Sequence, residues 1–306
     1  MGASAVRITA ADFLTPPEFE GLRLAVRSAG QIGGVRIELV ASGDATRLGA
    51  CYQQVPLRVL PPFQFAPDPA ALLYLLNPTA GLLDGDAHRI EITARPGTRA
   101  VVTGQSANRV HPALAGFSTQ QWHVHVASGA ELVILPGPTI PYQGCRYYQR
   151  IMIDLEAGAR LAWGDVWLPG RYARAAASEW FQFDQIVQEL EVRRQGELIY
   201  RERFHWKGPW GANEIRWFLG SERATASLFV TGSALAPFPA QDGSVERAIL
   251  ALASGDTCIR WCGVPTAVTA DVVATALTAA SRWSGGEVPW LLSSHNFGPN
   301  HWFAVG

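Results

Sequence analysis

The sequence has little charge and no apolar run long enough to cross a membrane. Asp, Glu, Lys and Arg make up 17% of its 306 residues, and the formal net charge is −1. Such a chain lacks the basic patch that holds nucleic acid or an anionic membrane. Its best apolar stretch, 70–83, is interrupted by Asn77-Pro78 and is too short for a membrane span. The segment 1–20 has no apolar signal sequence, so we expect a cytoplasmic protein.

Cysteine is also scarce. Cys51, Cys145, Cys258 and Cys262 are too few for a disulfide scaffold. If the last two share a strand, they lie about 13 Å apart, which is too far for a disulfide or one shared metal ion. We therefore expect four reduced thiols in a reducing compartment.

Enzyme signatures are missing as well. The sequence has no Gly-x-Ser-x-Gly elbow, no phosphate-cradling glycine-rich loop, no dinucleotide-binding fingerprint and no His-Glu-x-x-His helix. These absences favour a protein that is not an enzyme.

What the sequence does have is an internal repeat in a chain that is 48% hydrophobic and contains 11 Trp. Three segments read strand, glycine turn, strand, and are centred on Gly97, Gly129 and Gly158, about 30 residues apart. Apolar residues recur at every second position around each glycine, the period of a half-buried strand. The fifteen positions are Ile90, Ile92, Ala94, Ala100, Val102, Trp122, Val124, Val126, Leu132, Ile134, Ile151, Ile153, Leu155, Leu161 and Trp163.

This repeat predicts a mainly-β fold of stacked strand–turn–strand units, either an irregular β-helix or an elongated sandwich. No break in composition marks a boundary, so we expect one domain over residues 1–306. Further hairpins are predicted at Gln195-Gly196 and, with a weaker pattern, at Ser42-Gly43.

Two helices are expected beside the strands. Apolar residues at helical spacing predict one C-terminal helix over 270–283, with Thr269 as its cap and Asp271 in its first turn. A second, shorter helix is predicted over Trp180–Ile186, and the tail 289–306 looks irregular.

Candidate metal ligands are few. His123 and His125 alternate on a predicted strand and share one face, but no third ligand lies nearby in sequence. Such a pair is more often an exposed polar strand face. Asp84 and Asp86 flank Gly85, where two carboxylates on a turn bind hard cations only weakly. His295 and His301 have no ligand spacing.

Several strings resemble the UreD (UreH) family of urease accessory proteins. They are Leu57–Phe63 (LRVLPPF), Tyr74–Pro78 (YLLNP), Gly81–Asp86 (GLLDGD), Leu135–Ile140 (LPGPTI) and Glu156–Arg160 (EAGAR). The same order and spacing extend the resemblance over residues 22–215 and 245–283.

Some positions depart from the family pattern. Gly137-Pro138 stands where the family has Gln-Glu, Gln143 replaces an aspartate, and Asp165 lies near a family glutamate. The loop 103–113 keeps only a few of the family's residue types. The interior therefore has fewer carboxylates than the family, and the sequence does not fix the client protein.

The resemblance implies a non-catalytic factor that docks on apo-urease and helps deliver nickel, acting with UreF-type and UreG-type partners. Nickel would pass transiently, with no tightly bound cofactor, and a homodimer within the complex stays open. The alternatives are a scaffold of the same fold with another client, and a β-solenoid enzyme acting on a polysaccharide.

Charged residues near the ends of the repeats are the candidate channel or partner-binding residues. Asp86 and Arg109 flank the first repeat, and Asp165 and Arg171 follow the third, so stacking in register would bring them to one end of the molecule. Asp84 is included with them. Ordinary surface ion pairs are the alternative explanation.

Overall fold

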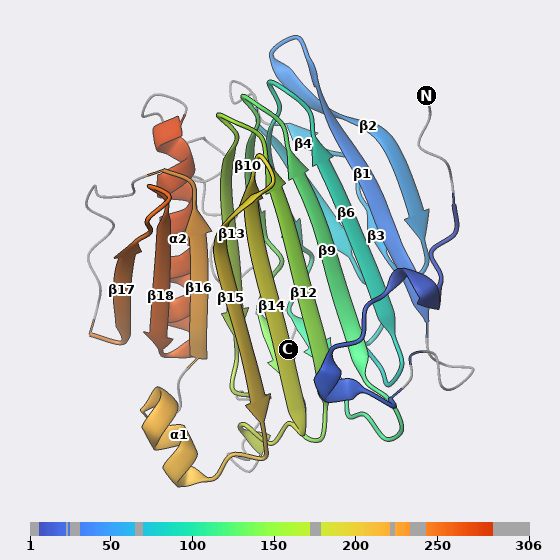
Figure 1. Cartoon of the computed structure of the whole chain (residues 1–306), viewed down its shortest axis with the longest axis vertical. Helices are drawn as coiled ribbons and strands as arrows, with labels where there is room; N and C mark the ends of the chain where they lie inside the picture. Colours follow the sequence, from blue (N-terminus) through green and yellow to red (C-terminus); the bar gives the residue numbers. More distant parts are fainter. Residues whose placement is uncertain are drawn as a thin grey trace.

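The protein is built mainly of β-strands, in two sheets that face each other (Figure 1). A computed structural model describes residues 6–22, 24, 31–64, 70–171, 179–220, 224–232 and 243–283. Within these ranges there are eighteen strands and two α-helices, which confirms the predicted fold class. No described helix is long and apolar enough to cross a membrane.

One sheet has seven strands, in the order β15-β14-β12-β9-β6-β1-β2. Their bounds are β1 Ile32–Ser42, β2 Ala45–Gln54, β6 Ala87–Ala94, β9 Ser118–Val126, β12 Arg146–Leu155, β14 Gln185–Arg194 and β15 Glu197–Lys207.

The other sheet has eleven strands, with β17-β18-β16-β13-β10-β7-β5-β3 as its main path. Their bounds are β3 Arg58–Val59, β4 Phe63–Gln64, β5 Ala71–Leu76, β7 Arg99–Gly104, β8 Asn108–Val110, β10 Glu131–Leu135, β11 Thr139–Pro141, β13 Arg160–Trp167, β16 Ala224–Val230, β17 Val245–Ala251 and β18 Thr257–Gly263.

The predicted repeat is the unit from which both sheets are built. Strands β6, β9 and β12 pair in parallel in one sheet, and their partners β7, β10 and β13 pair in parallel in the other. The turn glycines Gly97, Gly129 and Gly158 have φ of 75°, 70° and 75°, a conformation that glycine adopts without strain. All fifteen predicted apolar positions belong to the core between the sheets.

Antiparallel strands flank this parallel stack. The hairpins predicted at Gly43 and Gly196 are confirmed, as β1–β2 and β14–β15. The three-residue helical turns Ala10–Asp12 and Pro17–Phe19 cross the outer face of the seven-stranded sheet (Figure 1), where Phe19 packs with Phe117.

The C-terminal helix α2 (Pro265–Trp283) covers the outer face of the eleven-stranded sheet (Figure 1). It begins earlier than predicted, because Pro265 suits the first helical position. Thr269 is therefore not the cap; its hydroxyl donates to the carbonyl of Pro265 at 2.7 Å. Asp271 lies beyond the first turn and accepts from Trp261 Nε1 at 2.6 Å.

The helix predicted over Trp180–Ile186 is wrong. This segment is irregular until β14 begins, and Phe181 has φ of 56°. Its apolar residues are buried in an aromatic cluster with Trp210, and tertiary packing rather than helical periodicity explains their spacing. The second helix is α1 (Ala212–Leu219), which follows Gly211. The tail 289–306, with its two histidines, lies outside the described residues.

Candidate functional site in the interior of the sandwich

A row of polar side chains crosses the largely apolar inner face of the seven-stranded sheet. His88, Gln120, Gln149 and Gln188 occupy matching register positions on the neighbouring strands β6, β9, β12 and β14. Three of them are 0–2% exposed, and Gln120 is half-buried. We call these four residues the polar row; with strands about 4.8 Å apart, it spans about 14 Å.

Asp165 faces this row from β13 of the opposite sheet. Its carboxylate accepts hydrogen bonds from Trp163 Nε1 at 2.6 Å, Gln188 Nε2 at 3.0 Å and Gln149 Nε2 at 3.4 Å. Burial raises the pKa of Asp165 to about 7, because these neutral donors only partly offset the loss of hydration. A group of this kind exchanges a proton readily near neutral pH and can also accept a cation.

His88 ends the row with free coordinating capacity. Neither of its ring nitrogens has a hydrogen-bond partner among the described residues, although the side chain is fully buried. Burial lowers the pKa of His88 to about 4, so the imidazole is neutral at physiological pH. A neutral imidazole keeps one nitrogen lone pair that a metal ion can use.

An ion pair lies beyond the other end of the row. Glu202 on β15 accepts from Arg260 Nη1 at 2.6 Å and from the Tyr200 hydroxyl at 2.8 Å. Its charge also raises the pKa of Asp165, after the larger effect of burial. The interior therefore runs from a neutral imidazole, through amides and one carboxylate, to a paired carboxylate.

A hollow opens onto the row at Gln120. Its volume is about 70 Å³, and its lining residues include Ile90 and Trp122 of the seven-stranded sheet and Arg109 of β8. A side chain at Gly104 would place its Cβ 2.2 Å from the carbonyl oxygen of Pro136, so glycine keeps this wall thin. We call this space the Arg109 hollow.

Asp84 and Asp86 support the backbone of neighbouring loops. Asp84 accepts from the amides of residues 114, 115 and 116 at 2.9 Å each. Asp86 is 3% exposed and accepts from the amides of Gln31 at 2.7 Å and Leu83 at 2.8 Å. Burial raises the pKa of Asp86 despite these bonds. Both carboxylates thus have a clear role in holding the fold.

The predicted acid–base cluster does not form. Arg171 pairs with Glu179 and lies 4.8 Å over the ring of Tyr142. Among the described residues, no ion pair joins any two of Asp86, Arg109, Asp165 and Arg171. Each has its own surroundings, and their part in function stays a prediction.

His123 and His125 lie on the outer face of the seven-stranded sheet, on the same side of β9 as predicted. His125 contacts Glu156 at 3.2 Å. Burial lowers the pKa of His123, and Arg89 and Arg150 lower it further. In the described part of the chain, no three His, Cys, Asp or Glu residues are grouped to hold a metal ion.

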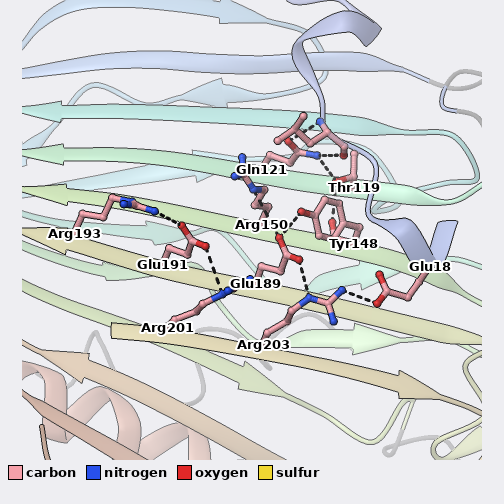
Figure 2. Close-up of polar contacts among 11 residues, drawn as sticks. Glu18, Thr119, Gln121, Tyr148, Arg150, Glu189, Glu191, Arg193, Arg201 and Arg203 are labelled. Carbon is pink, nitrogen blue, oxygen red and sulfur yellow. Dashed lines mark hydrogen bonds and ion pairs between the residues drawn. The ribbon is translucent and has the colours of Figure 1, made fainter. Parts of the chain in front are cut away.

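The same outer face carries a matched network of charges (Figure 2). Glu189 accepts from the Tyr148 hydroxyl at 2.9 Å and from Arg203 Nε at 2.8 Å, and Arg203 also reaches Glu18 at 2.6 Å. Glu191 pairs with both Arg193 and Arg201. With its charges paired in this way, the network is typical of a solvated surface rather than a reactive site.

The sequence contains a signal for three residues of the polar row and for Asp165. His88, Gln120 and Gln149 each stand nine residues before a repeat glycine, and Asp165 stands seven residues after the last one. Both offsets are odd, like those of the fifteen core positions, so the residues point inward.

Comparisons of the sequence with known proteins identify its family. The UreD urease accessory protein family matches residues 31–293. The urease accessory protein UreD of Deinococcus radiodurans is 32% identical over 212 residues, covering 69% of this chain and 74% of the relative. UreD of Opitutus terrae is 36% identical over 155 residues, covering 51% of this chain and 56% of the relative. The chain therefore belongs to the UreD family of urease accessory proteins.

Proposed function

We propose that this protein catalyses no reaction itself, docks on apo-urease and helps to deliver nickel to its active site, acting with UreF-type and UreG-type partners. Family membership supports the urease connection. The observation that carries the nickel part is the polar row with Asp165, placed inside the sandwich beside the apolar row of Ile90, Trp122, Ile151 and Leu190.

The row is costly for the fold. A buried polar group without a partner costs about 1–3 kcal/mol, and His88 carries two unpaired nitrogens. A leucine there would extend the apolar core that Ile90 already forms. A fold selected only for stability gains nothing from this histidine, which favours a role in function.

The donor types of the row suit a cargo ion in transit. One imidazole, amide oxygens and the carboxylate of Asp165 are nitrogen and oxygen ligands that nickel accepts. Each position offers only one or two of them, so no position can hold the ion as a closed four-ligand site does. Weak binding at several successive positions allows release as well as entry.

The test is an activation assay with matched acid-to-amide variants. Urease subunits are co-expressed with their accessory proteins and either Asp165→Asn or Asp154→Asn. Asp154 is exposed on the outer face and serves as the control. We expect Asp165→Asn to lower urease activity about tenfold or more, the scale typical of losing a group that orients or binds a metal. Nickel content of the purified urease should fall in parallel.

The proposal fails if Asp165→Asn activates urease as well as the control while remaining folded. A co-purification of the urease subunits with both variants separates docking from transfer. Unchanged docking with lost nickel loading is the expected result.

A different client remains a second candidate, favoured by Gly137 and Pro138 in place of the family's Gln-Glu. Capture of a nickel enzyme other than urease by the tagged chain, in cells that contain both, would support it. We do not propose polysaccharide hydrolysis, because Asp165 is only 3% exposed and sealed between the sheets, where a polymer cannot reach it.

A further inference from the structure

Strand β17 forms one edge of the eleven-stranded sheet, and the end of this strand is apolar and exposed (Figure 1). Its last four residues, 248–251, are all exposed, with Ile249 at 45% and Leu250 at 46%. No charged residue occurs between Arg247 and Asp256. An exposed apolar edge of this kind is a template for pairing with another strand.

The hydrogen bonds to β18 show which backbone groups of β17 face outward. Just beyond β17, the amide of Leu252 donates to the carbonyl of Asp256 at 2.8 Å. Because bonded positions alternate along an antiparallel pair, the even-numbered residues of β17 bond to β18 and the odd-numbered residues point their N–H and C=O groups away from it. Those of Ile249 and Ala251 have no hydrogen-bond partner among the described residues.

The other sheet edges are short, folded over or charged. At the far end of the eleven-stranded sheet, β3 and β4 have two residues each. Edge strand β2 is tied to β4 by Gln64, whose Nε2 donates to the carbonyl of Thr46 at 2.6 Å. Edge strand β15 exposes Arg201, Arg203 and Lys207, and such charges discourage strand pairing. Among the described strands, β17 alone combines an exposed apolar edge with a length of seven residues.

Neither neighbouring layer extends beyond β17. Helix α2 packs mainly on β16 and β13, and it reaches β17 through the ion pair of Asp271 with Arg247. From the opposite sheet, Tyr200 of β15 contacts Phe229 of β16 and Cys258 of β18. In the part of the chain that the structure describes, the edge at residues 248–251 is therefore open to a second strand.

A second copy of β17 fits this edge by its register. If two β17 strands run antiparallel about a two-fold axis at Ile249, this residue lies opposite Ile249 of the second copy, and Ala248 lies opposite Leu250. The outward N–H and C=O groups of the two Ile249 residues then bond to each other. An axis at Ala248 would instead put the charged Arg247 opposite Ile249, so apolar cross-strand contacts favour the first register.

The helices leave room for this pairing. The order β17-β18-β16 places β16 two strands from the edge, so the two β16 strands of a dimer lie five strand spacings apart, about 24 Å. A helix is about 10–12 Å wide with its side chains. The two α2 helices, which pack on β16, therefore do not collide.

We propose that β17 is a homodimer interface, in which the β17 strands of two copies pair antiparallel about Ile249 and join their eleven-stranded sheets into one. The pairing involves few residues, so its area lies below that of a standard protein interface, and we expect a weak dimer with a dissociation constant in the micromolar range. The interface is separate from the polar row, so it does not depend on nickel delivery.

Sedimentation velocity of the full-length chain measures the dimer. The wild type should change from monomer to dimer as its concentration rises from low to high micromolar. Ile249→Lys places two like charges opposite each other and removes the contact between the isoleucines, so it should weaken the dimer about tenfold or more, and Ile249→Glu should do the same. Leu114→Lys, at an exposed leucine between β8 and β9, is the matched control and should dimerise normally.

A mixture of the two charged variants tests the position of the axis. In equal amounts, Ile249→Lys and Ile249→Glu should recover the dimer, because a lysine then faces a glutamate across the axis. Only at the two-fold axis does a residue face its own counterpart. With an axis at Ala248, the Ile249→Glu variant alone would face Arg247 and form a tighter dimer than the wild type.

Four results would overturn the proposal. They are a wild type that stays monomeric at every concentration, an Ile249→Lys variant that associates as strongly as the wild type, an Ile249→Glu variant that associates more strongly, and a mixture that does not recover the dimer. Association through the exposed aromatic residues of α1 would give the second result. Thermal unfolding of each variant shows that a loss of the dimer does not come from a loss of fold.

Discussion

Replacing Asp165 with asparagine should stabilise the protein relative to the wild type, and this gain in stability should be larger at pH 7 than at pH 4. In the folded chain this carboxyl has a pKa of about 7, because burial disfavours its charged form, against an ordinary value of 3.8. Well below pH 3.8 the group is protonated in both the folded and the unfolded chain. Between pH 4 and 7 the unfolded chain loses the proton and the folded chain keeps it, so the wild type loses stability as pH rises.

The size of the effect follows from the two pKa values. Their separation is about three pKa units, and each unit corresponds to roughly 1.4 kcal/mol. The wild type should therefore lose about 4 kcal/mol of this contribution between pH 4 and pH 7, with little further change above pH 7. Asparagine has no proton to lose, and the oxygen of its amide can keep the hydrogen bond from Trp163 Nε1.

Denaturant unfolding at pH 4, 5, 6, 7 and 8, followed by near-ultraviolet circular dichroism, measures the difference between the two proteins. We expect the variant to gain relative to the wild type as pH rises, with a plateau above pH 7. Asp154→Asn, on the exposed outer face, should show no such trend. A difference that does not change with pH would refute the description of Asp165 as a buried carboxyl without a counter-cation. If the stability of the variant falls relative to that of the wild type as pH rises, a cation pairs with the carboxylate of Asp165.

Three further predictions concern other parts of the molecule. His88→Leu should leave the unfolding midpoint unchanged or raise it, because an apolar side chain replaces a buried imidazole that has no partner among the described residues. Urease activation should fall in the same variant. A lower unfolding midpoint in calorimetry would contradict this prediction. The isolated chain should bind nickel in the micromolar range or more weakly, since no described cluster offers three ligands, and a nanomolar constant in titration calorimetry would disagree. The chain alone should self-associate through its exposed aromatic residues, and a double change of Trp217, 84% exposed, and Phe218 to serine should shift light scattering towards the monomer.

The repeat could be predicted from the sequence because its information is local. Two-residue apolar periodicity and a glycine at the turn are properties of about 15 consecutive residues, and neither depends on distant contacts. The same reasoning failed at Trp180–Ile186, where Phe181 and Phe183 are spaced by their packing against Trp210 rather than by a helix. Tertiary contacts overrode local preference there.

The candidate site was only partly accessible from the sequence. The sequence predicts Asp165 as a site residue, but its neighbours Gln149 and Gln188 come from other strands and only the sheet register brings them together. The sequence predicts Asp84 and Asp86 as channel residues. In the structure both carboxylates accept hydrogen bonds from backbone amides, and such donors cannot be recognised in a sequence. The Arg109 hollow also depends on segments that are far apart in the chain.

The stacking of similar strand–turn–strand units gives this fold a width that can change in fixed steps. Each unit of about 30 residues adds one strand to each sheet, so inserting or deleting a whole unit would alter the width of both sheets by about 4.8 Å. The antiparallel strands at the two ends would remain as they are. A change by whole units keeps every core side chain facing inward, whereas a shift of one residue within a strand would turn its core side chains outward.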